Sequence, residues 1–162
     1  MITLGIDPGT ANTGYGVVAR VDGRLVALDG GVIRASGELG ARLCAIHERV
    51  TALIAEHRPD AVAVEDVYFG VNVRTAFAVG QARGVVLLAA GQQGLDCASY
   101  TPQQVKAAVC GSGRAEKLQV QRMVQTLLAL TTLPRPDHAA DALAVAICHA
   151  SAAPLRSAMA AL

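Results

Sequence analysis

The pattern of apolar and polar residues over the first third of the chain predicts strands. The apolar run Met1 to Ile6 ends at Asp7, and a Pro-Gly turn follows. Two β-rich runs, Gly14 to Val21 and Arg24 to Ile33, flank Asp22-Gly23. That dipeptide favours a type I′ hairpin because both central residues must adopt positive φ. The sequence therefore predicts that three antiparallel strands open the fold.

After these strands the pattern alternates between helical and strand periodicity. Between residues 38 and 57 apolar residues recur every three or four positions, which predicts a helix. The continuous apolar run 61–64, closing at Glu65, is typical of a buried strand parallel to the first. The later elements expected are a helix over 73–92, a strand over 96–100, a helix from Thr101-Pro102 to about Gly111, a helix over 116–130 and a helix over 137–150.

These elements predict one α/β domain over residues 1–150, built on a mixed five-stranded sheet flanked by helices, with a flexible tail over 151–162. The length of 162 residues fits one domain, and 52% hydrophobic residues argue against disorder. Uninterrupted apolar runs such as 85–90 and 142–148 are much shorter than the roughly 18 residues that a membrane span needs. With no export signal and four scattered cysteines, we expect a cytoplasmic protein without a membrane segment.

The charges are unevenly distributed, although the formal net charge is only +1. Residues 1–70 contain six basic and nine acidic side chains, whereas residues 71–125 contain six basic and two acidic ones. This asymmetry is compatible with an anionic, metal-attracting pocket beside a cationic surface that follows phosphates. Ordinary surface charge is the alternative interpretation.

The candidate chemistry lies at the ends of two predicted strands. If the strands ending at Asp7 and Glu65 are parallel neighbours, both carboxylates emerge at the sheet edge where α/β proteins place ligands. His138 and Asp141 share one face of a predicted helix. Crowded carboxylates are costly without cations, so we infer a pair of divalent ions that hydrolyses a phosphodiester. The alternatives are a solvated strand end at Glu65 and a helix-capping Asp137.

Six segments match one known family in the same order along the chain. They are 5–10 with 13–16, 65–68, 80–85, 104–106, 113–117 and 139–144. Through them nearly the whole chain resembles the bacterial RuvC Holliday-junction resolvases. The resemblance implies a ribonuclease H-like fold and a homodimer that nicks two opposing strands of a four-way DNA junction. The products would carry 5′-phosphate and 3′-hydroxyl ends, in DNA recombination and repair.

The resemblance also implies four catalytic, metal-binding positions: Asp7, Glu65, His138 and Asp141. An acidic residue is commoner in the family where this chain has His138. Imidazole suits transition metals better than Mg²⁺, so we expect two ions per subunit, Mg²⁺ or Mn²⁺, with Mn²⁺ preferred. Because a ligating imidazole must be unprotonated, we expect activity to fall below about pH 6.5.

Further positions are expected to bind DNA. The resemblance places Lys106 and Lys117 near the scissile phosphate and Tyr68 at the position of an aromatic that stacks on a base. Additional DNA-contact candidates are Arg74, Arg83 and Arg114. The helix over 73–92 is rich in small residues, so we expect it to form the dimer contact. The RuvA–RuvB branch-migration complex is a partner implied by the family alone.

Three other functions remain open on these residues. Asp7-Pro8-Gly9-Thr10 also resembles the first phosphate loop of actin-like and sugar-kinase ATPases, but those proteins need two such domains. A junction-binding protein without catalysis would keep the basic middle segment and tolerate loss of Asp7 or Glu65. A related ribonuclease H-like nuclease acting on RNA is the third alternative, which the matches at Lys106 and Lys117 disfavour.

Overall fold

A mixed five-stranded sheet forms the centre of the protein. The structure is a computed structural model that describes residues 1–66 and 73–160. The strands are β1 (Ile2–Asp7), β2 (Asn12–Val21), β3 (Arg24–Arg34), β4 (Ala61–Glu65) and β5 (Cys97–Tyr100), in the spatial order β3-β2-β1-β4-β5. The first three are antiparallel, and β4 pairs in parallel with both β1 and β5. The predicted α/β class and mixed sheet are therefore confirmed.

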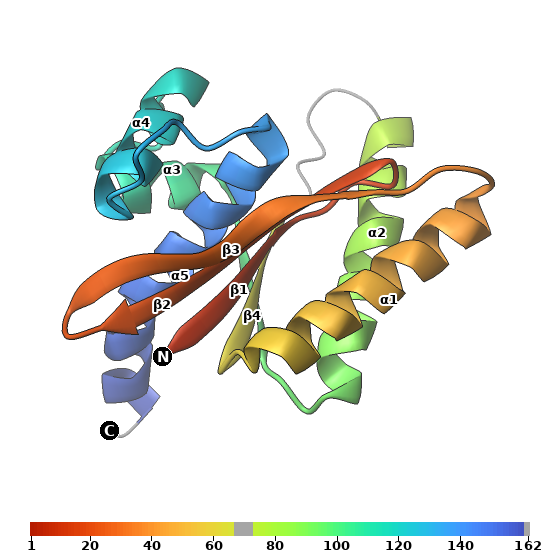
Figure 1. The fold of residues 1–162 in the computed structure, drawn as a ribbon, viewed down its shortest axis with the longest axis horizontal. Helices are drawn as coiled ribbons and strands as arrows, with labels where there is room; N and C mark the ends of the chain where they lie inside the picture. The colour runs from red at the N-terminus through yellow and green to blue at the C-terminus, as the bar shows by residue number, and fades with distance from the viewer. Residues whose placement is uncertain (67–72, 161–162) are drawn as a thin grey trace.

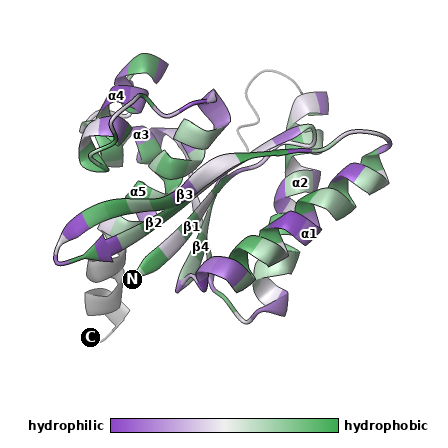
Figure 2. Ribbon diagram, viewed as in Figure 1, coloured by the Kyte–Doolittle hydropathy of each residue, from purple (hydrophilic) through white to green (hydrophobic). Residues whose placement is uncertain are grey.

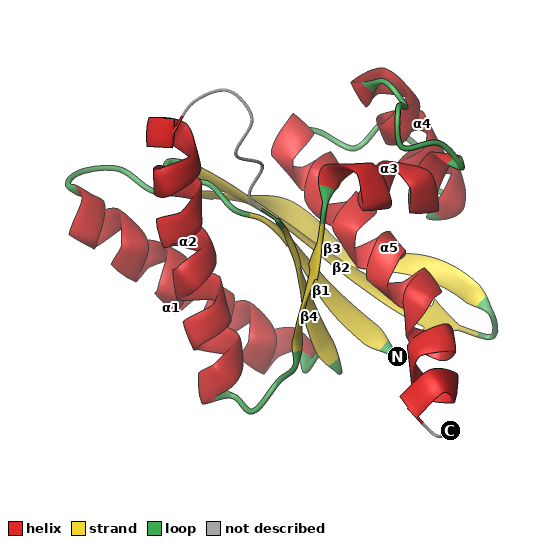
Figure 3. Ribbon diagram, turned by 180° about the vertical axis from the view of Figure 1, so that it is seen from behind, coloured by secondary structure: helices red, strands yellow, loops and turns green. Residues whose placement is uncertain are grey.

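Helices cover both faces of this sheet (Figure 1 and Figure 3). They are α1 (Leu39–His57), α2 (Val73–Gln92), α3 (Pro102–Cys110), α4 (Lys117–Leu127) and α5 (Asp137–Ala160). One face packs against α1 and α2, and the other packs against α5, with α3 and α4 beyond it. The start of α3 is fixed by a capping box between Thr101 and Gln104 and by Pro102 in its first turn.

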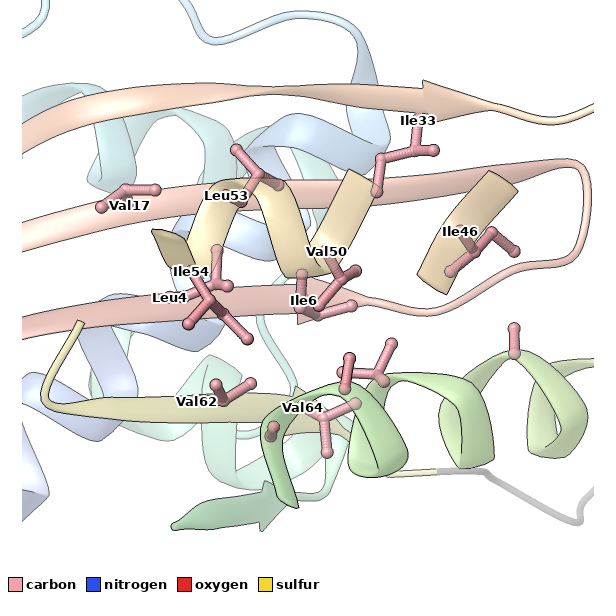
Figure 4. Close-up of a cluster of buried hydrophobic side chains, with 14 of the residues drawn as sticks. Leu4, Ile6, Val17, Ile33, Ile46, Val50, Leu53, Ile54, Val62 and Val64 are labelled. Atoms are coloured by element: carbon pink, nitrogen blue, oxygen red, sulfur yellow. The ribbon is translucent and has the colours of Figure 1, made fainter. Parts of the chain in front are cut away.

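Two clusters of buried apolar side chains hold these layers together. In the first, residues of β1 and β4 such as Leu4, Ile6 and Val64 cluster with α1 residues such as Ile46 and Val50 and with buried residues of α2 (Figure 4). The second joins the opposite sheet face to α3, α4 and α5. The first four residues of β4 are all buried because helices cover both faces there. Figure 2 accordingly shows hydrophobic residues along the central strands and hydrophilic ones toward the tips and outer helix faces.

Two predicted helix boundaries were wrong. Helix α4 ends at Leu127 rather than at residue 130, because Ala129 adopts a left-handed φ of 50° and Leu130 N–H donates back to the Gln125 carbonyl. Helix α5 continues to Ala160 rather than ending at residue 150. The expected tail is therefore helical as far as Ala160, consistent with the high helix propensity of its alanines.

Helix α2 exposes an apolar face. By length and composition it could cross a membrane, a test that core helices of soluble proteins also pass. Val73, Phe77 and Leu88 are 83%, 68% and 55% exposed. A Cβ atom built on Gly80 or Gly84 would meet nothing within 4 Å. No described part of this chain therefore packs closely against these two glycines.

Helix α5 lies directly on the backbone of β1 and β2. A Cβ atom on Gly14 would lie 1.9 Å from the His138 carbonyl oxygen, and one on Gly5 would lie 2.3 Å from the Ala142 carbonyl oxygen. A Cβ on Gly16 would come within 2.8 Å of Leu143. Because these three strand positions lack a side chain, the first turns of α5 reach the end of β1.

We predict that Gly14→Ala lowers the free energy of unfolding by at least about 2 kcal/mol, because the added methyl group forces the α5 backbone away from β2. Gly30→Ala is the matched control, since its Cβ would make only an ordinary contact of 3.5 Å with Leu143. Urea unfolding of both variants measures the difference. Equal stability of the two variants would contradict a close backbone contact.

Candidate active site

Two carboxylates lie together at the carboxyl end of the central strands. The parallel register pairs Ile6 of β1 with Val64 of β4, so Asp7 and Glu65 follow at the same end. Each is the last residue of its strand. Glu65 also pairs with Tyr100 of β5, which keeps it inside the sheet rather than in a free loop. This confirms the placement expected from the two strand patterns.

Helix α5 adds two further polar side chains to this end of the sheet. His138 Nδ1 donates a hydrogen bond of 2.7 Å to Asp7 Oδ2, which joins residues 131 positions apart in the sequence. Asp141 lies one turn further along α5 and interacts electrostatically with both Asp7 and Glu65. The structure therefore places all four residues that the sequence singled out at the same end of the sheet, with direct contact between His138 and Asp7.

Burial and mutual repulsion disfavour ionisation of Glu65 and Asp7. Burial, reinforced by the negative charges of Asp7 and Asp141, raises the pKa of Glu65 to about 8. The pKa of Asp7 is also raised, mainly by burial, although the hydrogen bond from His138 acts in the opposite direction. Glu65 and Asp7 therefore ionise less readily than free carboxyl groups, and a bound cation would favour their ionised forms.

Two lysines face the acids across a cavity of about 240 Å³. Lys117, at the start of α4, forms an ion pair with Asp141, with Nζ 3.3 Å from Oδ2. Lys106 of α3 lines the same cavity, and both positive charges lower the pKa of Glu65. The full lining comprises Glu65, Pro102, Val105, Lys106, Lys117, Val120, Asp141 and Ala144. Cations and carboxylates therefore face a common space that is open to a ligand.

The chemistry of the donors fits a divalent cation, but the donors are engaged with other groups. Three carboxylates and one imidazole suit Mg²⁺ or a transition metal. Among the described residues, no three His, Cys, Asp or Glu side chains stand close enough together to hold a metal. Asp7 is instead bonded to His138, and Asp141 to Lys117. Metal binding would exchange these contacts for metal–ligand bonds and would relieve the buried charge.

The other predicted DNA contacts lie in different environments. Arg74, in the first turn of α2, and Arg114, between α3 and α4, are exposed. Arg83 of α2 points inward instead: its Nη2 donates a hydrogen bond of 2.7 Å to Ser99 Oγ, and its Nε lies 3.5 Å from Asp66 Oδ1. Tyr68 lies outside the described residues.

Sequence reasoning missed the role of one residue. The sequence favours Asp137 as a helix cap, but its carboxylate forms an ion pair with Lys117 and accepts a hydrogen bond from Gln121. The signal available in the sequence was its spacing: Asp137 and Asp141 are one helical turn apart, so both face the same neighbouring helix.

Comparisons with known proteins identify related sequences and folds. The model of a family described as crossover junction endodeoxyribonuclease RuvC matches residues 3–149. Proteins of that name from Moorella thermoacetica and Syntrophomonas wolfei are 55% and 54% identical, over 96% and 92% of this chain and 95% and 88% of theirs. The structure of Thermus thermophilus RuvC in complex with a Holliday junction substrate is 41% identical, covers 97% of both chains and superposes with a TM-score of 0.91.

We predict that Glu65→Gln stabilises the metal-free protein at alkaline pH. A folded-state pKa near 8 exceeds the ordinary 4.5, so ionisation of Glu65 costs nothing below pH 4.5 and destabilises the fold increasingly up to pH 8. With a chelator at pH 8, Tm should rise by at least about 3 °C, and the gain should shrink at pH 5. Glu48→Gln, an exposed substitution on α1, is the control. An unchanged Tm at pH 8 would contradict the charge burial.

Proposed function

The chain belongs to the crossover junction endodeoxyribonuclease RuvC family, and from that membership we propose that it resolves four-way DNA junctions by paired, symmetric, metal-dependent nicks at the site described above. Its fold is ribonuclease H-like, and it is an endodeoxyribonuclease. The observation that carries the assignment of the site is the convergence of Asp7 and Glu65 with His138 and Asp141 at one end of the sheet.

The metal-binding residues in this proposal are Asp7, Glu65, His138 and Asp141. Two divalent ions in a site of this kind supply water activation and stabilisation of the leaving oxygen. Hydrolysis with the 3′ oxygen as the leaving group leaves a 5′-phosphate and a 3′-hydroxyl. The contribution of the protein is orientation: β1 and β4 fix two carboxylates, and α5 brings the other two ligands against them.

Lys106 and Lys117 are assigned to the scissile phosphate. Both line the cavity that contains Glu65 and Asp141, so a phosphate entering it would meet two ammonium groups. Positive charge beside the reacting phosphate stabilises the transition state more than the ground state. The exposed Arg74 and Arg114 extend the positive charge outward along α2 and the α3–α4 connection, where phosphates of the junction arms would pass. Tyr68 is proposed to stack on a base near the junction centre.

We propose that the exposed face of α2 forms a homodimer. Val73, Phe77 and Leu88 are exposed, and Gly80 and Gly84 leave open space that a second backbone could approach. A two-fold contact there would present two identical sites to the two opposing strands of a symmetric junction. The RuvA–RuvB complex is the further partner expected from the family, and the reaction is assigned to the cytoplasm.

The proposal is tested by nicking assays on a synthetic four-way junction, a linear duplex and an RNA–DNA hybrid, with Mg²⁺ or Mn²⁺. The wild-type protein should cut the junction in preference to both other substrates. Asp7→Asn should reduce the rate by at least about 100-fold while junction binding persists, because only the metal-dependent step is lost. Preferential cutting of the hybrid would favour an RNA nuclease, and undiminished cutting by Asp7→Asn would exclude this site.

The imidazole of His138 predicts a preference for Mn²⁺ over Mg²⁺ in junction cleavage. His138→Asp should move the ratio of the two rates toward Mg²⁺, since a fourth carboxylate is a harder ligand. His47→Asp, at a histidine of α1 that is bonded to Gln92, controls for the general effect of replacing an imidazole. The same Mn²⁺ to Mg²⁺ rate ratio in wild type and His138→Asp would show that His138 is not a ligand.

A further inference from the structure

Asp137 lies beside the four metal-binding candidates and shares a lysine with one of them. Lys117 Nζ is 3.2 Å from Asp137 Oδ2 and 3.3 Å from Asp141 Oδ2. Gln121 Nε2 donates a hydrogen bond of 2.9 Å to the other oxygen of Asp137. Lys117 and Gln121 are one turn apart on α4, and Asp137 and Asp141 are one turn apart on α5. The two helices therefore hold a bridged set of four side chains.

This arrangement creates a competition at Asp141. An ammonium group 3.3 Å from its carboxylate must lose part of that interaction before the oxygen can ligate a divalent cation. If Asp141 were the only anionic partner, release of Lys117 would add to the cost of metal binding. Asp137 offers a second carboxylate at a similar distance, and Gln121 holds that carboxylate in place.

We propose that Asp137 is a positioning residue that retains Lys117 when Asp141 takes up a divalent cation. The ammonium group then stays at the edge of the cavity shared with Glu65 and Lys106, where the scissile phosphate would enter. This inference rests on the proposed function of the site. It assigns to Asp137 neither metal ligation nor contact with the substrate.

The expected effect of removing the Asp137 carboxylate on metal affinity is modest, because the ion pair between Lys117 and Asp137 is exposed. The side chains of Lys117 and Asp137 are 54% and 60% exposed, so water screens their attraction. An ion pair of this type changes an equilibrium by about two- to fivefold. The expected change in metal affinity is therefore of that order, which a double-mutant cycle resolves.

The test is the binding of Mn²⁺ to the metal-free protein, measured from the free Mn²⁺ signal by electron paramagnetic resonance. Asp137→Asn should weaken binding by about two- to fivefold, and Asp137→Glu should restore it. The amide introduced by Asp137→Asn can still accept the hydrogen bond from Gln121, so the fold should be retained. In a Lys117→Met background, Asp137→Asn should have no effect, because there is no ammonium group left to retain. Glu116→Gln removes a neighbouring exposed charge and should leave binding unchanged.

A second measurement is the metal dependence of junction cleavage. Asp137→Asn should raise the Mn²⁺ concentration that gives half the maximal rate, and it should lower the maximal rate by up to about fivefold, because Lys117 is then less well held beside the scissile phosphate.

Unchanged Mn²⁺ binding in Asp137→Asn, or the same loss with and without Lys117, would overturn the positioning role. The second result would mean that Asp137 acts only through its own negative charge. A wild-type protein that binds no Mn²⁺ would overturn the proposed active site as well. The two failures are thus distinguished by the wild-type titration.

Discussion

The contact between the backbone of α5 and the backbone of β1 and β2 is the constraint on which the site depends. Gly5 and Gly14 leave no Cβ atoms between helix and sheet, and a methyl group at either position would collide with α5 carbonyl oxygens. Because the helix lies this close, His138 reaches Asp7 although 131 residues separate them. Side chains of ordinary size at these strand positions would hold α5 away from the carboxylates of β1 and β4.

The same closeness concentrates negative charge, and neighbouring groups offset part of it. Burial and like charges raise the pKa values of Glu65 and Asp7, which is unfavourable for folding at neutral pH. His138 and Lys117 supply a hydrogen bond and a positive charge to the acids. The apolar side chains buried on both faces of the sheet stabilise the fold and offset the remaining cost of burying these acids. A site that is unfavourable when empty of cations is well suited to binding them.

Local patterns in the sequence predicted the strands, the parallel pairing of β1 with β4, and the placement of Asp7 and Glu65 at strand ends and of His138 and Asp141 on one helix face. That the two pairs of residues form one site was implied by the family resemblance. Side-chain contacts between elements were not predictable. The ion pair between Lys117 and Asp137 depends on how α4 packs against α5, and the inward course of Arg83 depends on how α2 lies beside β5. The partner of the open face at Gly80 and Gly84 was not predictable either, because a pattern of small residues does not identify the surface that packs against them.

The central claim is that four side chains from β1, β4 and α5 hold divalent cations together. Anomalous scattering from crystals soaked in Mn²⁺ tests it most directly. The account predicts anomalous density within ligand distance of Asp7, Glu65, His138 and Asp141, with Lys117 displaced from Asp141. Well-ordered side chains at these positions without such density, or Mn²⁺ bound elsewhere, would contradict it.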